Sequence, residues 1–276
     1  PRSLETFAKV AQERVRDELV KLLVRGAPPG RGLRLLLRTG LLGRIAPELL
    51  ESVGFAQNSF HAWDVWKHTL RCVDESPPEL VLRLAALLHD VAKPRTAAPS
   101  QSRPGDRSFF RHEFVGEDLT RAILERLRFP RREIERVALL VREHNWHYLP
   151  EWTDATCRRV IARVGPENLP ALYQLRRADL KARGRFVEEG LANLALLEER
   201  FSRLLAQSAV LKITDLAVGG DELMAALGLR PGPAVGKLLA RLLEHVLDHP
   251  DLNTREALLR LAAEALPELS TGNPQA

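Results

Sequence analysis

Apolar and polar positions alternate along almost the whole chain at the spacing of an α-helix. Leu19, Leu22 and Leu23 follow a charged opening stretch at steps that place them on one helix face. Leucine and alanine are abundant and aromatic residues make up only 5% of the chain, which favours packed helices over strands. No segment predicts a convincing strand. We therefore predict an all-α fold with helices over residues 3–25, 31–38, 41–53, 61–74, 79–92, 113–127, 131–143, 154–164, 168–183, 185–208, 220–227, 232–247 and 253–265.

Short polar side chains and irregular stretches mark the ends of these helices. Asp154 is expected to cap the helix that follows it, and Asn253 or Thr254 to cap the last helix. The longest irregular stretch, residues 94–108, is of a length that is either functional or disordered. A second boundary at residues 213–220 precedes a compact helical tail.

Charge and cysteine content narrow the class of protein. A formal net charge of +5 favours a polyanionic partner, although arginine-rich solvated helix faces are common. Two cysteines are too few for a disulfide framework and predict a reducing compartment. No apolar run approaches a membrane span and no signal peptide is recognisable, so we predict a cytoplasmic protein without a membrane partner. The chain begins with Pro1, which fits either a removed initiator Met or a piece of a longer protein.

The sharpest local feature is a His-Asp pair at the end of an apolar helix. His89 and Asp90 follow Leu87 and Leu88, and burial of both side chains is costly without compensation. A divalent cation compensates well, because neutral imidazole and carboxylate are both good ligands for such ions. Two further ligands are required. His68, upstream, and Asp179, far downstream, are the candidates, each in a helical context.

The order of a histidine, a His-Asp pair and a distant aspartate resembles that of the HD phosphohydrolase superfamily. The resemblance implies a helical HD domain with a divalent ion, which can be manganese, magnesium, iron, cobalt, nickel or zinc. It also implies that His112 and His144 bind a second metal ion or the substrate phosphate. The alternative, that both are ordinary helix-end histidines, stays open. For His61, which shares a helical stripe with His68, a structural role is expected.

These residue types predict a metal-dependent phosphoric ester hydrolase. A bound divalent ion supplies hydroxide near neutral pH and polarises a phosphoryl oxygen. Lys93 and Arg111 are expected to hold the phosphate together with His112 and His144, and one of these histidines is expected to protonate the leaving group. Catalytic roles are therefore predicted for His89, Asp90, Lys93, His112 and His144.

A second resemblance runs nearly from end to end. The segments that look like the body and tail of bacterial tRNA nucleotidyltransferases and poly(A) polymerases are residues 11–20, 40–49, 64–70 with Gln57 and His61, 127–130, 215–224 and 229–236. The Gly-Ser motif and paired carboxylates of that family's catalytic head do not occur in this sequence. The resemblance implies a helical neck and body at 1–55, an HD domain at 56–212 and a smaller helical tail at 213–276.

Three functions compete on this basis. The leading one is hydrolysis of nucleotide or RNA 3′-end phosphates, as a 2′,3′-cyclic phosphodiesterase, 2′-nucleotidase or phosphatase. The second is a non-catalytic body and tail that binds tRNA or another RNA. The third is hydrolysis of a nucleotide second messenger. Arginines near one helix junction and on a later helix fit an RNA partner or a solvated face equally well, and the oligomeric state stays open. These arginines are Arg126, Arg128, Arg131, Arg132, Arg136, Arg158, Arg159 and Arg163.

Overall fold

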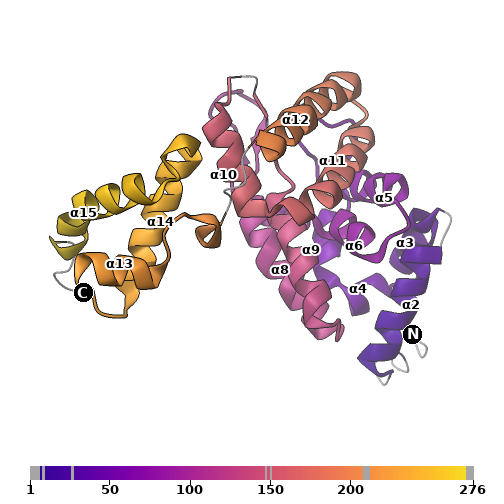
Figure 1. Cartoon of the computed structure of the whole chain (residues 1–276). Coiled ribbons are helices and arrows are strands. Elements are labelled where there is room, and N and C mark those ends of the chain that lie inside the picture. Colours follow the sequence, from indigo (N-terminus) through magenta and orange to yellow (C-terminus); the bar gives the residue numbers. More distant parts are fainter. Residues whose placement is uncertain are drawn as a thin grey trace. The chain divides into compact units, whose positions relative to one another are not determined.

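The computed structural model describes residues 7, 10–25, 28–146, 148–149, 151–207 and 212–271, with side chains as far as Leu266. The chain divides into two compact units, residues 1–147 with 167–195 and residues 148–166 with 196–276 (Figure 1). Helices dominate both units, which confirms the all-α prediction. The predicted division into neck, HD domain and tail stays a prediction.

The first unit is built from helices of two to four turns with shorter pieces between them. Its helices are α2 (Gln12–Arg25), α3 (Pro29–Arg38), α4 (Leu42–Ile45), α5 (Val65–Glu75), α6 (Leu80–Leu88), α7 (Lys93–Thr96), α8 (His112–Arg126), α9 (Arg131–Glu143) and α11 (Leu169–Arg183), with a 3₁₀ helix η1 (Pro47–Ser52). Helix α6 packs against α2, α5, α9 and α11, and α8 lies beside α9 (Figure 1). Every residue from Leu82 to Leu88 is buried, which makes α6 the centre of this unit. Each buried leucine contributes roughly 1.5–3 kcal/mol.

Three of the predicted helices end or begin elsewhere for local reasons. The carboxylate of Asp64 accepts the backbone N–H of Lys67 at 2.9 Å, so α5 begins at Val65 rather than at residue 61. The predicted helix 79–92 ends at Leu88, and the chain turns before α7. The predicted helix 41–53 divides into α4 and η1, because Pro47 has no N–H to continue the helical hydrogen bonding.

The predicted irregular stretch 94–108 contains a small antiparallel pair of strands. Strand β1 (Ala98–Pro99) pairs with β2 (Arg107–Ser108), with Ala98 opposite Ser108. The expectation that the chain has no strand is therefore wrong for these four residues. The Asp106 carboxylate accepts hydrogen bonds from the hydroxyl and backbone N–H of Ser59, which fixes this stretch to the segment before α5.

The second unit has its own core. It contains α10 (Asp154–Val164), α13 (Gly220–Leu227), α14 (Pro233–Asp248), α15 (Arg255–Thr271) and the 3₁₀ helices η3 (Ile213–Asp215) and η4 (Pro250–Leu252), while α12 (Val187–Gln207) and η2 (Pro166–Asn168) run across the division. Leu223, Leu238, Leu242 and Leu258 are completely buried between α13, α14 and α15.

The caps in the second unit agree with the sequence in one case and differ in the other. Thr254 accepts the backbone N–H of Ala257 at 3.3 Å and caps α15 as predicted. The cap of α10 is Thr153, one residue before the predicted Asp154, whose carboxylate pairs with Arg200 instead. Among the described residues, no helix is long and apolar enough to cross a membrane.

Candidate metal centre

Four side chains from three parts of the first unit meet at one buried point. His68 lies on α5, His89 and Asp90 follow the end of α6, and Asp179 lies on α11; each side chain is at most 5% exposed. His68 Nε2 is 3.2 Å from His89 Nε2 and 3.1 Å from Asp179 Oδ1. Asp90 Oδ2 is 3.2 Å from His89 Nε2 and 3.5 Å from His68 Nε2. The structure thus brings together all four predicted metal ligands.

A second group forms on the other oxygen of the same aspartate. His112 begins α8 and His144 follows α9, and their Nε2 atoms lie 3.2 Å apart. Asp90 Oδ1 is 3.5 Å from His112 Nε2 and 3.7 Å from His144 Nε2. Asp90 therefore joins the two groups through its two oxygens. Donor atoms lie within 4.8 Å of one another in three sets: His68, His89 and Asp90; His61, His68 and Asp179; and Asp90, His112 and His144.

Backbone carbonyls orient three of the imidazole rings. The Nδ1 atoms of His89, His112 and His144 lie 2.9, 2.8 and 2.6 Å from the carbonyl oxygens of Ala86, Phe109 and Val141. We assign a proton to Nδ1 of each of these rings, which leaves Nε2 of His112 and Nε2 of His144 facing each other at 3.2 Å. A metal cation between two such nitrogen atoms would be bound by both. The donor set therefore fits a divalent ion.

The carboxylates of the cluster are ionised. Burial opposes ionisation of Asp90, but His89 and Lys93 outweigh it and hold its pKa well below the ordinary value. Burial likewise opposes ionisation of Asp179, and Arg183, His68 and Arg176 hold its pKa well below the ordinary value. Lys93 Nζ lies 2.7 Å from Asp90 Oδ2 and donates to Gln57 Oε1 at 2.7 Å. These cations balance part of the negative charge.

Burial also keeps histidines in the neutral form that binds metals. Desolvation, followed by the neighbouring His144, lowers the pKa of His112 to about 3. Desolvation, followed by Lys93, lowers the pKa of His61 to about 2. His61 Nδ1 is 2.8 Å from Asn58 Oδ1, and its Nε2 is buried without a hydrogen-bond partner. The His61 ring, 5.0 Å from that of His68, thus offers a free lone pair beside the cluster.

A cavity of about 310 Å³ opens above the cluster. Its wall includes Asp90, Lys93, His112, His144 and Asp179, and Arg111 is not among its lining residues. The Arg111 guanidinium is exposed and lies 4.8 Å from the ring centre of Phe114. Of the predicted site residues, Asp90, Lys93, His112, His144 and Asp179 thus line this cavity. His68 and His89 do not line it but contact Asp90 and Asp179 in the buried cluster, and Arg111 lies apart from both.

Sequence reasoning missed Arg176 and Arg183, two cations of the cavity wall. Arg176 Nη1 is 2.6 Å and Arg183 Nη2 is 3.2 Å from Asp179 Oδ2. Their positions three before and four after Asp179 are the available signal, because such spacings share a helix face. Desolvation lowers the pKa of the Arg176 guanidinium to about 10, so it is still cationic near neutral pH.

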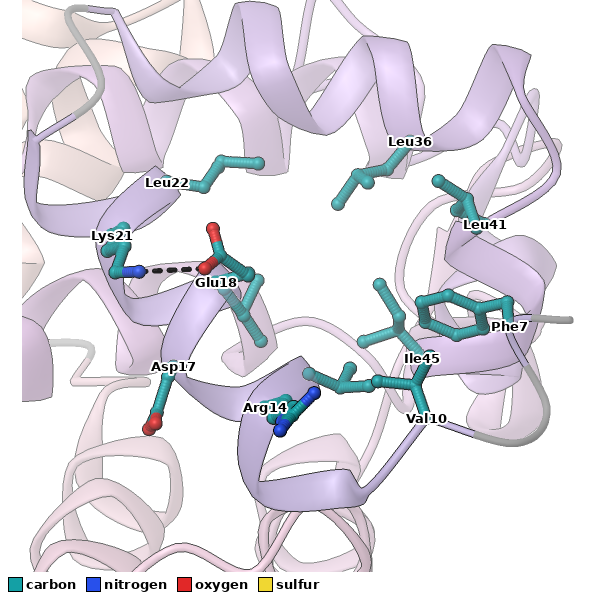
Figure 2. Close-up of a pocket in the computed structure, with 12 residues that line it drawn as sticks. Phe7, Val10, Arg14, Asp17, Glu18, Lys21, Leu22, Leu36, Leu41 and Ile45 are labelled. Carbon is teal, nitrogen blue, oxygen red and sulfur yellow. Dashed lines mark hydrogen bonds and ion pairs between the residues drawn. The ribbon is translucent and has the colours of Figure 1, made fainter. Parts of the chain in front are cut away.

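Another hollow of the first unit has no such chemistry. It has a volume of about 530 Å³ and lies between the start of the chain, α2, α3 and α4. Figure 2 shows Leu22, Leu36, Leu41 and Ile45 around it, with the ion pair of Glu18 and Lys21 at its edge. Its wall is mainly apolar, so this hollow has no set of metal-binding or catalytic side chains like that of the His-Asp cluster.

Two family profiles match the chain. Residues 114–262 match the family described as putative tRNA nucleotidyltransferase domain 2, and residues 3–52 match the probable RNA- and SrmB-binding site of polymerase A. The first match alone covers more than half of the chain. Residues 53–113, which include His68, His89 and Asp90, lie between the two matched regions.

Curated proteins with similar sequences are also named as tRNA nucleotidyltransferases. The chain is 40% identical over 246 residues to an A-adding tRNA nucleotidyltransferase of Deinococcus radiodurans, which covers 85% of this chain and 54% of that protein. It is 41% identical over 241 residues to a CC-adding tRNA nucleotidyltransferase of Thermus thermophilus, at 85% and 52% coverage. A multifunctional CCA protein of Burkholderia pseudomallei is 32% identical over 181 residues, at 63% and 42% coverage. The chain thus spans about half the length of the first two relatives.

These findings correct the predicted activity. The assignment as a phosphoric ester hydrolase is wrong, because the relatives are nucleotidyltransferases, which are transferases. The physical reason for the error is that histidines and aspartates around a metal ion are equally suited to holding helices together. A buried set of ligands therefore does not by itself indicate hydrolysis. The resemblance to the HD superfamily stays a prediction.

Proposed function

The chain belongs to the family described as putative tRNA nucleotidyltransferase domain 2, and we propose that it is the helical, tRNA-binding part of such an enzyme. The observation that carries the proposal is the 40% identity to the Deinococcus enzyme over 85% of this chain. The match of residues 3–52 to a probable RNA-binding site of polymerase A supports the same function. A net charge of +5 suits a polyanionic ligand. The cytoplasm stays the predicted compartment.

Direct binding tests this function. The purified chain is titrated into a fluorescently labelled tRNA transcript at about 150 mM salt, with double-stranded DNA of equal length as the competitor. We expect a Kd below ~1 μM for the tRNA, because non-specific binding to nucleic acid has a Kd of roughly 1–100 μM. Equal competition by the DNA, or no binding below 100 μM, would contradict the proposal.

We also propose that the His-Asp cluster holds a divalent metal ion. His68, His89, Asp90 and Asp179 would bind it, and Asp90, His112 and His144 offer a second position. The close approach of the Nε2 atoms and the two ionised carboxylates support this assignment. A bound ion would neutralise the charge of the two carboxylates. Because its ligands come from α5, the end of α6 and α11, it would also hold these elements together. This role is compatible with the RNA-binding function and requires no reaction at the cluster.

Metal content and stability test the cluster directly. Elemental analysis of the purified chain, after dialysis without chelator, is expected to find a divalent ion bound. The variant His89→Gln is expected to lose it. Stabilisation by a bound ligand is about 2.7 kcal/mol at a hundred times its Kd, so added metal ion should raise the Tm of the wild-type chain only. Equal responses of both proteins would exclude this cluster as the metal site.

A further inference from the structure

A basic groove lies between α3 and α5, apart from the His-Asp cavity. It has a volume of about 790 Å³, and two pairs of cations line it, Arg34 and Arg38 from α3 and Lys67 and Arg71 from α5. All four residues are exposed. Each pair has a spacing of four, which keeps both side chains on one face of its helix. The two helices thus present four basic side chains to one hollow, whose wall also includes the carboxylates of Asp64 and Asp74.

The cations of the groove have fewer acidic partners than several of the arginines identified in the sequence. Within the described part of the chain, Arg34 and Arg38 form no ion pair, and Lys67 has one carboxylate partner, Asp64. By contrast, Arg159 on α10 pairs with Glu244 and Asp248, and Arg158 donates to the carbonyl oxygens of Leu247 and Asp248. Arg126 on α8 is engaged by Glu48. Arg34 and Arg38 therefore have more uncompensated charge to offer a ligand than Arg126, Arg158 and Arg159, and they line a hollow.

Aromatic side chains complete the groove. Trp63 and Trp66 are among its lining residues, and the Arg71 guanidinium carbon lies 4.1 Å from the Trp63 ring centre. This contact fixes the position of a guanidinium group at the wall. The indole Nε1 of Trp63 is buried without a hydrogen-bond partner. Cations interleaved with aromatic rings suit a ligand that has both phosphates and flat bases.

The approach of α3 to α5 is built into both helices. Gly30, at the start of α3, donates its backbone N–H to Asp74 Oδ1 on α5 at 2.7 Å. A Cβ at Gly30 would lie 2.7 Å from Asp74 Oδ2, too close for a side chain without rearrangement. Pro28, which precedes α3, makes no side-chain cap, so Asp74 acts as the cap from the neighbouring helix. The groove therefore has a defined width.

We propose that this groove is the surface on which the chain binds the sugar-phosphate backbone of RNA. The proposal rests on the proposed tRNA-binding function and names the site for it. Helix α3 lies within the region that matches a probable RNA-binding site, residues 3–52, whereas α5 lies outside both matched regions. Charge complementarity selects a polyanion, and the partly exposed Trp63 favours RNA over an acidic protein segment, whereas Trp66 is buried.

A pair of matched double variants tests the groove. R34Q/R38Q removes two unpaired groove cations, and R132Q/R136Q removes two exposed arginines of α9 that have the same spacing and no ion pair among the described residues. Both variants change the net charge equally. We expect R34Q/R38Q to lower affinity for the tRNA transcript by about tenfold or more, and R132Q/R136Q to change it by less than about threefold. R34K/R38K, which keeps both charges, should bind within about threefold of the wild type.

The outcomes separate the groove from the function. If the wild-type chain does not bind tRNA, the proposed function fails. If it binds and R34Q/R38Q binds equally well, the groove proposal alone is overturned. Equal losses in both glutamine variants would assign the affinity to net charge and also overturn it. Unchanged tRNA binding with lost binding of a polyglutamate peptide in R34Q/R38Q would assign the groove to an acidic protein partner instead.

Discussion

The first unit holds two polar regions that are organised in opposite ways. In the His-Asp cluster the charged groups are buried and face partners of opposite charge, such as Asp179 between Arg176 and Arg183. In the groove, Arg34 and Arg38 are exposed and without an ion pair in the described structure. Buried charges must be matched within the protein, because desolvation is costly. Exposed and unmatched charges cost little and stay available to a ligand.

Because of this difference, substitutions in the two regions should change different properties of the protein. Loss of a charge from the cluster should appear mainly in the free energy of unfolding, since its partners stay buried. Loss of a charge from the groove should appear mainly in affinity for RNA and in its dependence on salt.

The largest effect is expected from Asp179→Ala. This variant leaves Arg176 without its carboxylate partner and removes the nearer of the two carboxylates beside His68. Removal of one member of a buried ion pair destabilises a protein by about 3–5 kcal/mol. Urea unfolding of both proteins, in chelator so that metal binding does not contribute, measures the difference. A loss below about 1 kcal/mol would show that the cluster is open to water.

Acid should destabilise the metal-free chain through His112. Its pKa is lowered to about 3 by burial and by His144, against about 6.5 in the unfolded chain. Between these values the unfolded chain binds the extra proton, so stability falls as the pH falls through this window. The pKa difference predicts a loss of roughly 3 kcal/mol from pH 7 to pH 4. The variant His112→Gln lacks this titration and should show a smaller slope in urea unfolding; identical slopes would contradict the assignment.

The spacing of the groove should depend on Asp74. Asp74→Ala removes the acceptor for the Gly30 N–H at the start of α3. Loss of a helix cap costs about 1 kcal/mol, within a range of roughly 0.5–2 kcal/mol. Thermal unfolding measures this cost. The same variant should weaken tRNA binding without a change in metal content. If Asp74→Ala lost bound metal instead, the groove and the His-Asp cluster would not be structurally independent.

The smallest change in stability is expected from R34Q/R38Q. These exposed arginines have no ion pair in the described structure, and such surface substitutions change stability by about 0.5 kcal/mol or less. Denaturant midpoints that match the wild-type value would confirm that any loss of RNA affinity arises at the surface. A loss of more than about 2 kcal/mol in the free energy of unfolding would show that Arg34 and Arg38 contribute to the packing of the protein and are not simply exposed.

The cluster was more accessible to sequence reasoning than the groove. His89 and Asp90 are adjacent and interrupt an apolar helix, so a single local pattern exposed them, and His68 and Asp179 followed from helical context. The groove requires that Arg34 and Arg38 lie opposite Lys67 and Arg71, and this pairing depends on how α3 packs against α5. Tertiary packing of that kind has no local signal.

Helix type was predictable and helix ends were less so. The apolar period predicted most helices, because each buries one face in a core. Local hydrogen bonds decided the ends, as at Thr153, which caps α10 where Asp154 was expected. The activity was mispredicted for a different reason: His and Asp ligands define a metal site without defining what the site does.

The salt dependence of tRNA affinity tests the central claim most directly. The logarithm of the association constant is measured against the logarithm of salt concentration for the wild-type chain, R34Q/R38Q and R132Q/R136Q. Each phosphate contact that is removed lowers the magnitude of the slope by about one, so R34Q/R38Q should lower it by about two and R132Q/R136Q should leave it unchanged. A wild-type chain that binds tRNA with no salt dependence, or three equal slopes, would contradict the account.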